Sequence, residues 1–341
     1  MKLGITGLPQ SGRSTVFEAL TQKIGSGEHK AEERIATISV PDHRVDRLND
    51  QYKLPKTIYV QVEYFLPGTK AGDTKDQSLW NAVRDCDALI HVVRNHTGFG
   101  LEQKTPYEDV LKLDQELMFN DLVVAEKRLE RMELDHQRGK KMNPEEHSLL
   151  EDCRSHLEDD IPLRTVPEIA SAPLLRGYAF LSAKPMLVLL NNDDDDDSMP
   201  DVVDLTQKQI CLVIRGKLEQ ELNQMPTEEA AEFRAEFNIS ASAPERIIKG
   251  SYELLDLISF FTIGKKEIRA WAIKKDTPAL DAAEVIHTDM KKGFIRAEVV
   301  SYDDFMKAAS YVEAKKKGAV RLEGKTYKVQ DGDIILFRFN V

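Results

Sequence analysis

Residues 7–15 have the types and the spacing of a phosphate-binding loop. They read G-L-P-Q-S-G-R-S-T, which matches the P-loop pattern at every position except Arg13, where the pattern has lysine. Glycines at the two ends of the loop let backbone N–H groups converge on phosphate oxygens, and the Ser14 hydroxyl can coordinate Mg²⁺. The predicted phosphate-binding residues are Gly7, Leu8, Pro9, Gln10, Ser11, Gly12, Arg13, Ser14 and Thr15.

The segments on either side of this loop are those that a P-loop needs. Residues 2–6 form a short apolar run that predicts a buried strand, and residues 14–20 have helical spacing. The N-terminus of the helix adds the positive end of its dipole to the anion site. A glycine-rich turn in an unrelated α/β protein is the alternative interpretation, but the strand, both glycines and the Ser-Thr pair favour a nucleotide site.

Arginine at position 13 has different consequences for phosphate binding and for catalysis. The lysine ammonium is a compact charge that follows the β- and γ-phosphates during transfer, whereas a guanidinium is planar and wider. We therefore expect Arg13 to hold phosphate but to support phosphoryl transfer poorly. Nucleotide binding is predicted, and hydrolysis is left open.

Composition limits the class of protein. The 341 residues suffice for two or three domains. The N-terminal segment has no signal-peptide pattern, and the sequence has no run of about 18 apolar residues, so we expect an unprocessed cytoplasmic protein with no membrane span. Cys86, Cys153 and Cys211 are scattered, which predicts reduced, partly buried thiols and neither disulfides nor a zinc site.

The charge is distributed unevenly along the chain. A net charge of -11 argues against general coating of nucleic acid, and no pattern indicates DNA specificity. Residues 265–341, however, hold 16 Lys and Arg against 12 Asp and Glu, a local excess of +4 that leaves -15 for the rest. This C-terminal region could contact RNA phosphate, or it could be an ordinary solvated surface.

Apolar runs at residues 58–65, 88–94 and 186–190 predict strands, and helical stretches separate them. This is the pattern of a parallel sheet covered by helices on both faces, with the P-loop at the carboxyl end of the first strand. His91, within the second run, is interpreted as a packed histidine. The five aspartates at 193–197 predict a mobile acidic loop.

A long charged helical pattern spans residues 109–160 and is interrupted at Asn143-Pro144. It predicts an antiparallel helical hairpin with Arg138-Gly-Lys-Lys141 at the tip. That basic tip could contact a ribonucleoprotein or could be a solvated turn. From Ile258 onward the chain is rich in strand-forming residues and glycines, which predicts a separate small sheet domain.

Several long motifs in the C-terminal third resemble one known family. These are FFTIGKKEIRAW at 260–271, VIHTDMKKGFIRAEVV at 285–300 and RLEGKTYKVQDGDIILFRFNV at 321–341. They closely resemble the TGS domain of the YchF or Obg-like ATPases, a branch of the translation-factor-related P-loop NTPases. VPDHRVDRL at 40–48, ALIHVVR at 88–94 and AEKRLER at 125–131 extend the resemblance to most of the chain.

The resemblance implies an α/β fold made of three parts. A Ras-like P-loop nucleotide-binding domain is expected at 1–108 and 166–257, an inserted helical coiled-coil hairpin at 109–165, and a C-terminal β-grasp-like TGS domain at 258–341. It also implies ATP or GTP bound with Mg²⁺, and a ribosome or RNA as partner.

The family's base-reading N-x-x-E sequence corresponds here to Asn191-Asn-Asp-Asp194. Asn191 and Asp194 are therefore the predicted base-binding residues, and the shorter aspartate leaves the choice between ATP and GTP open. Alternatively, Asn191 merely ends a strand. A second base motif, S-A-K, corresponds to Arg215-Gly-Lys, whereas the S-A-K at 182–184 precedes a strand and is not the equivalent.

The metal site departs furthest from the family pattern. Phe65-Leu-Pro-Gly68 replaces the family's Asp-Ile-Ala-Gly, whose aspartate holds the water shell of Mg²⁺. Glu63 is expected to face the wrong side of the strand to substitute for it. Thr37 is what remains of the first switch, so Ser14 and Thr37 are the predicted metal ligands.

Three hypotheses follow from these residues. The first is a YchF-type protein that binds nucleotide as a conformational ligand, with hydrolysis much slower than usual. The second is a slow ATPase in which Asp73 or Glu63 supplies metal contacts. The third is a pseudo-NTPase scaffold that acts through protein or RNA contacts of its TGS domain.

Overall fold

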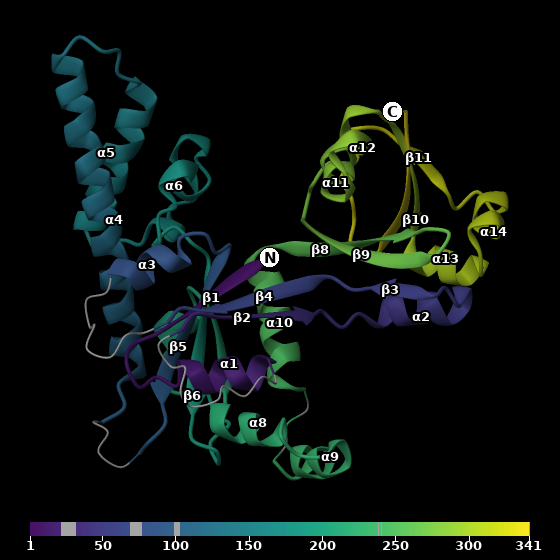
Figure 1. Ribbon diagram of the computed structural model, residues 1–341, viewed down its shortest axis with the longest axis horizontal. Helices are drawn as coiled ribbons and strands as arrows, with labels where there is room; N and C mark the ends of the chain where they lie inside the picture. Colours follow the sequence, from purple (N-terminus) through teal and green to yellow (C-terminus); the bar gives the residue numbers. More distant parts are fainter. Residues whose placement is uncertain (22–31, 69–76, 99–102, 238, 240, 341) are drawn as a thin grey trace. The chain divides into compact units, whose positions relative to one another are not determined.

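The computed structural model describes residues 1–341 except 22–31, 69–76, 99–102, 238, 240 and 341 (Figure 1). Contacts between residues divide the described chain into two compact units. The first comprises Met1–Ile38 and Glu63–Gly250, and the second comprises Ser39–Val62 and Ser251–Val341.

A six-stranded sheet with the order β2-β4-β1-β5-β6-β7 forms the centre of the first unit. Its strands are β1 (Lys2–Thr6), β2 (Arg34–Ser39), β4 (Gln61–Leu66), β5 (Ala88–Asn95), β6 (Met186–Asn192) and β7 (Ile210–Ile214). The pairs β1–β4, β1–β5, β5–β6 and β6–β7 are parallel. Strands β1, β5 and β6 are buried along almost their whole length, as expected for continuous apolar runs in a parallel sheet.

Helices connect these strands. They are α1 (Arg13–Thr21), α3 (Gln77–Val83), α4 (Pro106–Gln137), α5 (Pro144–Glu158), α6 (Pro167–Ala170), α7 (Val203–Thr206), α8 (Gly216–Leu222), α9 (Thr227–Glu236) and α10 (Ala243–Leu254), with 3-10 turns η1 (Leu163–Thr165) and η2 (Pro173–Tyr178). The alternation of strand and helix is the predicted α/β pattern.

The helical hairpin between β5 and β6 is present as predicted. Helix α5 begins at Pro144, and the Asn143 side chain accepts hydrogen bonds from the N–H groups of Glu145 and Glu146. Proline in the first turn and asparagine at the N-cap are both favoured at a helix start, so the dipeptide that interrupts the helical pattern also begins the second helix. Buried apolar side chains, including Leu129 and Leu150, hold α4 against α5.

The second unit contains another six-stranded sheet, with the order β11-β10-β12-β8-β9-β3. Its strands are β3 (Lys56–Ile58), β8 (Leu257–Ile263), β9 (Glu267–Lys274), β10 (Phe294–Ser301), β11 (Arg321–Glu323) and β12 (Asp333–Phe339). Its helices are α2 (His43–Tyr52), α11 (Ala279–Ile286), α12 (Thr288–Lys292), α13 (Tyr302–Ala308) and α14 (Tyr311–Lys316). Helices α11 and α12 contribute to one apolar core, and α2, α13 and α14 contribute to the other.

The prediction of one strand over residues 58–65 is wrong. Ile58 ends β3, which pairs with β9 in the second sheet, whereas β4 begins at Gln61 and belongs to the first sheet. Residues Ser39–Val62 accordingly group with the C-terminal unit, although the sequence assigned 1–108 to the nucleotide domain. Tyr59 and Val60 pack against the apolar core of the second unit, so the alternating pattern continues through the change of sheet and conceals it.

The three cysteines are free thiols, as predicted. Burial raises the pKa of Cys86 to about 11, of Cys153 to about 12 and of Cys211 to about 11, which makes all three poor nucleophiles at neutral pH. Within the described residues, no helix has both the length and the apolar character needed to cross a membrane.

Candidate functional site

The P-loop lies between the end of β1 and the start of α1, where the sequence placed it. Gly7 and Gly12 both have positive φ, 148° and 91°, and neither has room for a side chain. A Cβ at Gly7 would lie 2.4 Å from the carbonyl oxygen of Val92, and a Cβ at Gly12 would lie 2.3 Å from Nδ2 of Asn191. The two glycines are therefore required by the backbone conformation and by the close approach of β5 and β6.

Arg13 is the first residue of α1 and is partly buried beside this loop. Burial lowers the pKa of its guanidinium below the usual value for arginine. In the described part of the chain, no hydrogen bond or ion pair involves its side chain. A partly buried cation without a partner is unfavourable unless an anion completes it, so Arg13 is available to a phosphate.

Four consecutive residues at the end of β6, Asn191 to Asp194, form side-chain hydrogen bonds with neighbouring segments. Nδ2 of Asn191 donates to the carbonyl oxygen of Ser11 at 3.0 Å, and its Oδ1 accepts from N–H of Gly216 at 3.0 Å. Asn191 is 4% exposed, so this amide joins the P-loop to the start of α8 in a buried position. Oδ1 of Asp194 accepts from N–H of Leu218 at 3.0 Å and caps the same helix.

The two residues between them hold the end of β5. Oδ1 of Asn192 accepts from Nδ2 of Asn95 at 2.9 Å. Oδ1 of Asp193 accepts from both N–H and Oγ1 of Thr97, at 2.8 and 3.0 Å. The acidic run was predicted to be a mobile loop, but hydrogen-bond donors from neighbouring segments partner these carboxylates and offset their mutual repulsion.

His96 is a site residue that the sequence interpretation missed. Its Nε2 lies 4.0 Å from the position that a Cβ on Gly12 would occupy, so the partly buried imidazole stands beside the P-loop. The signal available in the sequence was its place directly after a buried strand, because such positions meet at the carboxyl edge of a parallel sheet.

Of the predicted base-binding pair, Asn191 has few groups left to bind a base. One N–H and the carbonyl oxygen of Asn191 are already engaged within the protein, which leaves one N–H for a ligand. The S-A-K sequence at 182–184 lies elsewhere: Ser182 is buried, and its N–H donates to Asp121 of the hairpin helix α4 at 2.6 Å. Arg215, at the alternative position, precedes α8 and donates to the carbonyl oxygen of Phe237.

The assignment of Ser14 and Thr37 as metal ligands stays a prediction. Ser14 is exposed in the first turn of α1, and Thr37 is exposed on β2, which β4 separates from β1 in the sheet. Phe65 and Leu66 are 3% and 5% exposed, so apolar side chains occupy the end of β4. Asp73 lies outside the described residues, and within them no cluster of three His, Cys, Asp or Glu side chains could hold a metal.

His91 is a packed histidine, as interpreted. It is fully buried on β5, and neither of its ring nitrogens has a hydrogen-bond partner among the residues that the structure describes. Burial, with the Arg164 charge as a second cause, lowers the pKa of His91 to about 3, so the ring is neutral and has no role as a proton donor at neutral pH.

Comparisons with known proteins address the resemblance directly. A family model described as YchF-GTPase_C, "Protein of unknown function (DUF933)", matches residues 257–340. Two curated relatives named "Ribosome-binding ATPase YchF" match over nearly the full length of both chains. The Bacillus subtilis protein is 33% identical over 99% of each chain, and the Pasteurella multocida protein is 35% identical over 100% of this chain and 99% of its own. The chain belongs to the YchF family.

Solved structures agree with this assignment. The Schizosaccharomyces pombe YchF GTPase superposes with a TM-score of 0.82 over 99% of this chain and 97% of that chain, at 27% identity. A GTP-binding protein of Pyrococcus horikoshii matches over the whole of both chains with a TM-score of 0.63 and 18% identity, which shows the fold alone. The predicted α/β fold and the resemblance to YchF proteins are confirmed.

Within this YchF-family chain, the parts of the site differ in how they are built. The phosphate loop is formed mainly by backbone and is intact in shape. At the end of β4, the apolar side chains of Phe65 and Leu66 are buried. The site can therefore bind a phosphate ester through N–H groups and Arg13, and it offers little to the metal beyond the Ser14 hydroxyl.

Proposed function

We propose that this YchF-family chain is a cytoplasmic protein that binds a purine nucleotide, ATP or GTP, in its P-loop. The observation that carries the proposal is the unpaired, partly buried Arg13 beside a glycine loop whose shape leaves no room for side chains. Both features favour an anion at the start of α1, where the helix dipole adds to the attraction. The remaining N–H of Asn191 supports a ring nitrogen of the base.

Mg²⁺ would accompany the nucleotide and neutralise charge on its phosphates. The donor set fits a metal that is held chiefly by phosphate oxygens and water, with the exposed Ser14 hydroxyl as the protein ligand. Thr37 is proposed as a second ligand through the first switch. A site of this kind has weak protein control over the metal, because Phe65-Leu-Pro-Gly68, at the end of β4, contains no carboxylate.

Hydrolysis is proposed to be slow. Arg13 cannot follow the transferring phosphoryl group as a lysine ammonium does, and the missing aspartate removes an anchor for the metal. The nucleotide would then act mainly as a ligand that favours one conformation over another. The alternative of a scaffold that binds no nucleotide remains an outcome of the test below.

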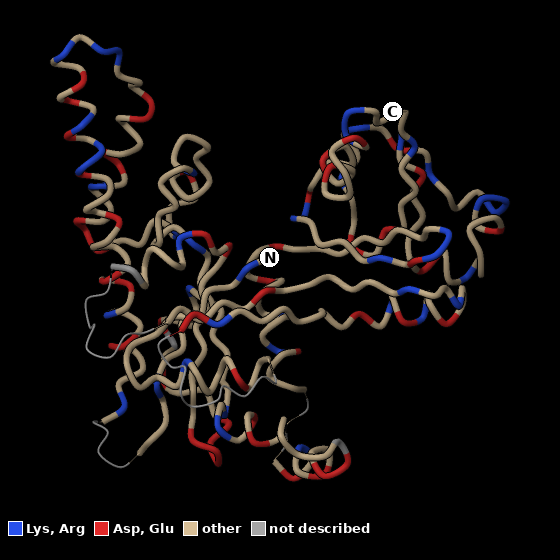
Figure 2. The backbone as a smooth tube through the Cα atoms, in the orientation of Figure 1, with Lys and Arg blue, Asp and Glu red and all other residues tan. Residues whose placement is uncertain are grey.

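The hairpin tip is the proposed point of contact with the ribosome, the partner named for the curated relatives. Lys and Arg gather at this end of the hairpin (Figure 2). Arg138 and Lys141 are exposed and have no ion-pair partner within the described residues, whereas Lys140 pairs with Asp135 at 2.9 Å. Unpaired surface cations can approach RNA phosphates without first breaking an internal pair.

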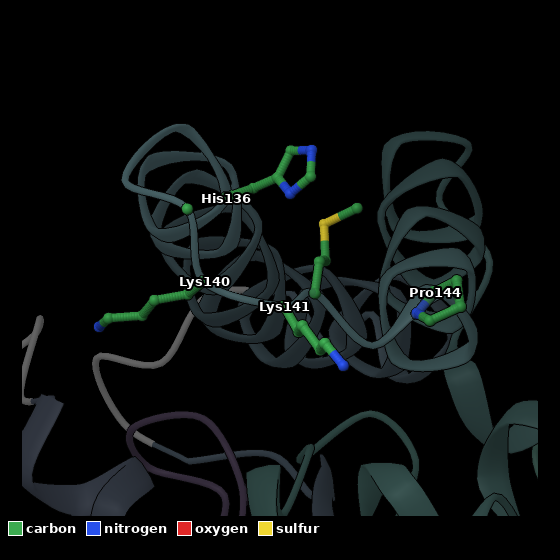
Figure 3. Close-up of a pocket in the computed structure, with 6 residues that line it drawn as sticks. His136, Lys140, Lys141 and Pro144 are labelled. Atoms are coloured by element: carbon green, nitrogen blue, oxygen red, sulfur yellow. The ribbon is translucent and has the colours of Figure 1, made fainter.

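Figure 3 shows the side chains at this tip. Lys140 and Lys141 extend from the loop in different directions, and His136 lies toward the space between the two helices. An open hollow is lined by His136, Gly139, Lys140, Lys141, Met142 and Pro144. Because Lys140 is paired with Asp135, Lys141 and Arg138 are proposed as the residues that contact ribosomal phosphates.

Calorimetric titration of nucleotide-stripped protein with ATP and Mg²⁺ tests nucleotide binding. We expect micromolar affinity for the wild type and a loss of at least about a hundredfold for Gly12→Val, because the added side chain would collide with Asn191. Gly177→Val is the matched control, since a Cβ at Gly177 meets nothing within 4 Å. Absence of binding by the wild type at millimolar ATP would contradict the proposal and favour the scaffold.

Co-sedimentation with ribosomes tests the proposed tip contact separately. Reversal of charge in the double variant Arg138→Glu, Lys141→Glu should weaken binding, and the effect should shrink as salt is raised. Lys208→Glu is the control because Lys208 is also exposed in the first unit but lies outside the hairpin. Equal binding by the double variant and the control would exclude the tip as the contact.

A further inference from the structure

The buried ring of His91 faces the first helix of the hairpin. Its neighbours Leu89 and Val93 on β5 pack with apolar residues of α4, Leu89 in one cluster with Leu113 and Val93 in another with Val110. Side chains two residues apart on a strand point to the same face of the sheet. His91 therefore points toward α4 from between these two apolar clusters.

Asp114 faces β5 from the opposite side of this interface. It follows Leu113 directly and Val110 by one helical turn, and all three residues are at most 5% exposed. Its Oδ2 accepts from Nη2 of Arg164 at 2.6 Å, in a pair whose side chains are 7% and 10% exposed. Burial and, after it, the charge of Arg164 lower the pKa of His91, so the guanidinium lies near the ring. We call His91, Asp114 and Arg164 the His91 cluster.

The direct ion pair does not complete the hydrogen bonding of the His91 cluster. Oδ1 of Asp114, Nη1 of Arg164 and both ring nitrogens of His91 are buried and have no partner among the residues that the structure describes. Oδ1 and Nη1 belong to the two groups that Oδ2 and Nη2 already join, so these two atoms lie close together. The cluster thus has a charged acceptor, a charged donor and a neutral imidazole with one donor and one acceptor.

Asp121, two helical turns further along α4, is a useful comparison. Its Oδ1 accepts from N–H of Leu181 at 2.9 Å, and its Oδ2 accepts from N–H of Ser182 at 2.6 Å. Arg84 also pairs with this carboxylate, at 3.4 Å. Both oxygens of Asp121 therefore have partners within the protein, whereas Asp114 has one for a single oxygen. A charged atom that is buried without a partner is costly, so the second oxygen of Asp114 calls for a donor of another kind.

A single water molecule has the complementary groups. Water has two O–H donors and two lone pairs, and a buried water typically forms about three hydrogen bonds. It can accept from Nη1 of Arg164 and donate to Oδ1 of Asp114, and its remaining O–H or lone pair suits a ring nitrogen of His91 in either tautomer. We propose that the His91 cluster binds one internal water, which joins these three side chains.

The bound water connects the root of the hairpin to the strand beside the P-loop. Asp114 belongs to α4, His91 belongs to β5, and Arg164 lies in η1, which follows the hairpin. The next residue of β5, Val92, packs against the P-loop, since its carbonyl oxygen would lie 2.4 Å from a Cβ on Gly7. The water therefore completes a buried polar link between the hairpin and the strand that borders the phosphate site.

Magnetic relaxation dispersion of solvent ²H counts long-lived internal waters of the full-length protein in solution. The double variant Asp114→Leu, Arg164→Met removes both charged partners of the water, and we expect it to hold one long-lived water fewer than the wild type. Thr6→Val is the matched control. Thr6 lies beside His91 in the β1–β5 pair and is fully buried, but its hydroxyl already donates to the carbonyl oxygen of Ile90 at 3.3 Å. Its count should equal that of the wild type.

Nuclear Overhauser contacts between water and the carbon-bound ring protons of His91 provide a second test, which needs only the wild type to be folded. The ring signals are assigned by their loss in His91→Leu, and unfolding temperatures show which variants remain folded. We expect a contact with a water that stays bound for longer than the tumbling time of the protein. Absence of this contact in the wild type, or an unchanged count of long-lived waters in a folded double variant, would overturn the proposal.

Discussion

In the C-terminal unit, the buried carboxylate of Glu298 accepts hydrogen bonds from Arg338, at 3.0 and 3.3 Å, and from the hydroxyl of Tyr311. At the P-loop, Arg13 has no such partner in the described chain, and the Oγ atom of Ser11 is buried without one. Both regions place polar groups away from water, and the cluster around Glu298 completes its hydrogen bonding from within. Other buried polar atoms, such as Oη of Tyr302 in the C-terminal unit, also have no partner among the described residues, so the proposal of a ligand at the P-loop depends on the position of Arg13 and Ser11 in a glycine loop at the start of a helix.

The same contrast separates two roles of charge. Arg44 of α2 pairs with Asp42 and Asp331, and its guanidinium also lies 4.9 Å from the ring centroid of Phe261. This arrangement joins residues 39–62 to the C-terminal sheet and raises the pKa of Arg44 despite its burial. Charges with several internal partners stabilise the fold, whereas charges without them are available for function.

Among the variants at the P-loop, Asn191→Ala should have the largest effect on ATP affinity. It leaves the carbonyl oxygen of Ser11 and the N–H of Gly216 without partners in a buried place and frees the P-loop from β6. We expect ATP affinity to fall about a hundredfold in calorimetry. Asn223→Ala is the control, because that amide also donates to a carbonyl oxygen, of Ala19 in α1, but holds no part of the loop. Equal losses of ATP affinity in the two variants would show that the hydrogen bonds of Asn191 have no specific role in nucleotide binding.

Among the variants in the C-terminal unit, Glu298→Ala should have the largest effect on the free energy of unfolding. It leaves Arg338 and the Tyr311 hydroxyl without their shared acceptor, and we expect the free energy of unfolding to fall by about 2 kcal/mol. Urea denaturation measures this. The nucleotide affinity of the folded variant should be unchanged. A parallel loss of affinity would show that the Glu298 cluster also supports nucleotide binding.

The same carboxylate predicts a pH dependence of stability. Hydrogen bonds from Arg338 and Tyr311 lower the pKa of Glu298 from 4.5 to about 2. Because the folded pKa lies below the unfolded value, the stabilisation is complete above about pH 4.5 and is lost as the pH falls toward about 2. Urea midpoints between pH 5 and 3 should therefore decline less steeply in Glu298→Gln than in the wild type. Parallel declines would show that other carboxylates dominate.

Arg13→Lys should have a smaller effect, and in the opposite direction. A lysine ammonium can follow the transferring phosphoryl group, so we expect the Mg²⁺-dependent rate of ATP hydrolysis to rise by about tenfold. The rate should remain well below one per second because Phe65-Leu-Pro-Gly68, at the end of β4, has no carboxylate to hold the metal. A wild-type rate at or above one per second would show that the replaced residues are not needed for hydrolysis.

The parts of the fold that sequence could predict are those set by local pattern. The P-loop, the hairpin that restarts at Asn143-Pro144, and the three buried central strands each follow from spacing within a short window. The transfer of Ile58 to the second sheet could not be predicted, because the alternation of apolar residues continues across Tyr59 and Val60 while the partner strand changes.

The residues of the candidate site could also be predicted only in part from the sequence. Gly7, Gly12 and Arg13 are recognisable by type and spacing, whereas His96 becomes a site residue only because β5 and β6 end side by side next to the loop. The partners of the acidic run could not be predicted for the same reason. The donors to Asp193 and Asp194 come from Thr97 and Leu218, which are far away in sequence.

Thermal unfolding of Arg13→Met, with and without ATP and Mg²⁺, tests most directly the claim that unpaired polar groups mark the ligand site. Methionine keeps an unbranched apolar side chain and removes a partly buried charge that has no partner within the described residues. Without nucleotide, the variant should unfold at the same or a higher temperature than the wild type, and with ATP it should gain much less stability. A variant that is less stable without nucleotide but keeps the full ATP-induced gain would contradict the account.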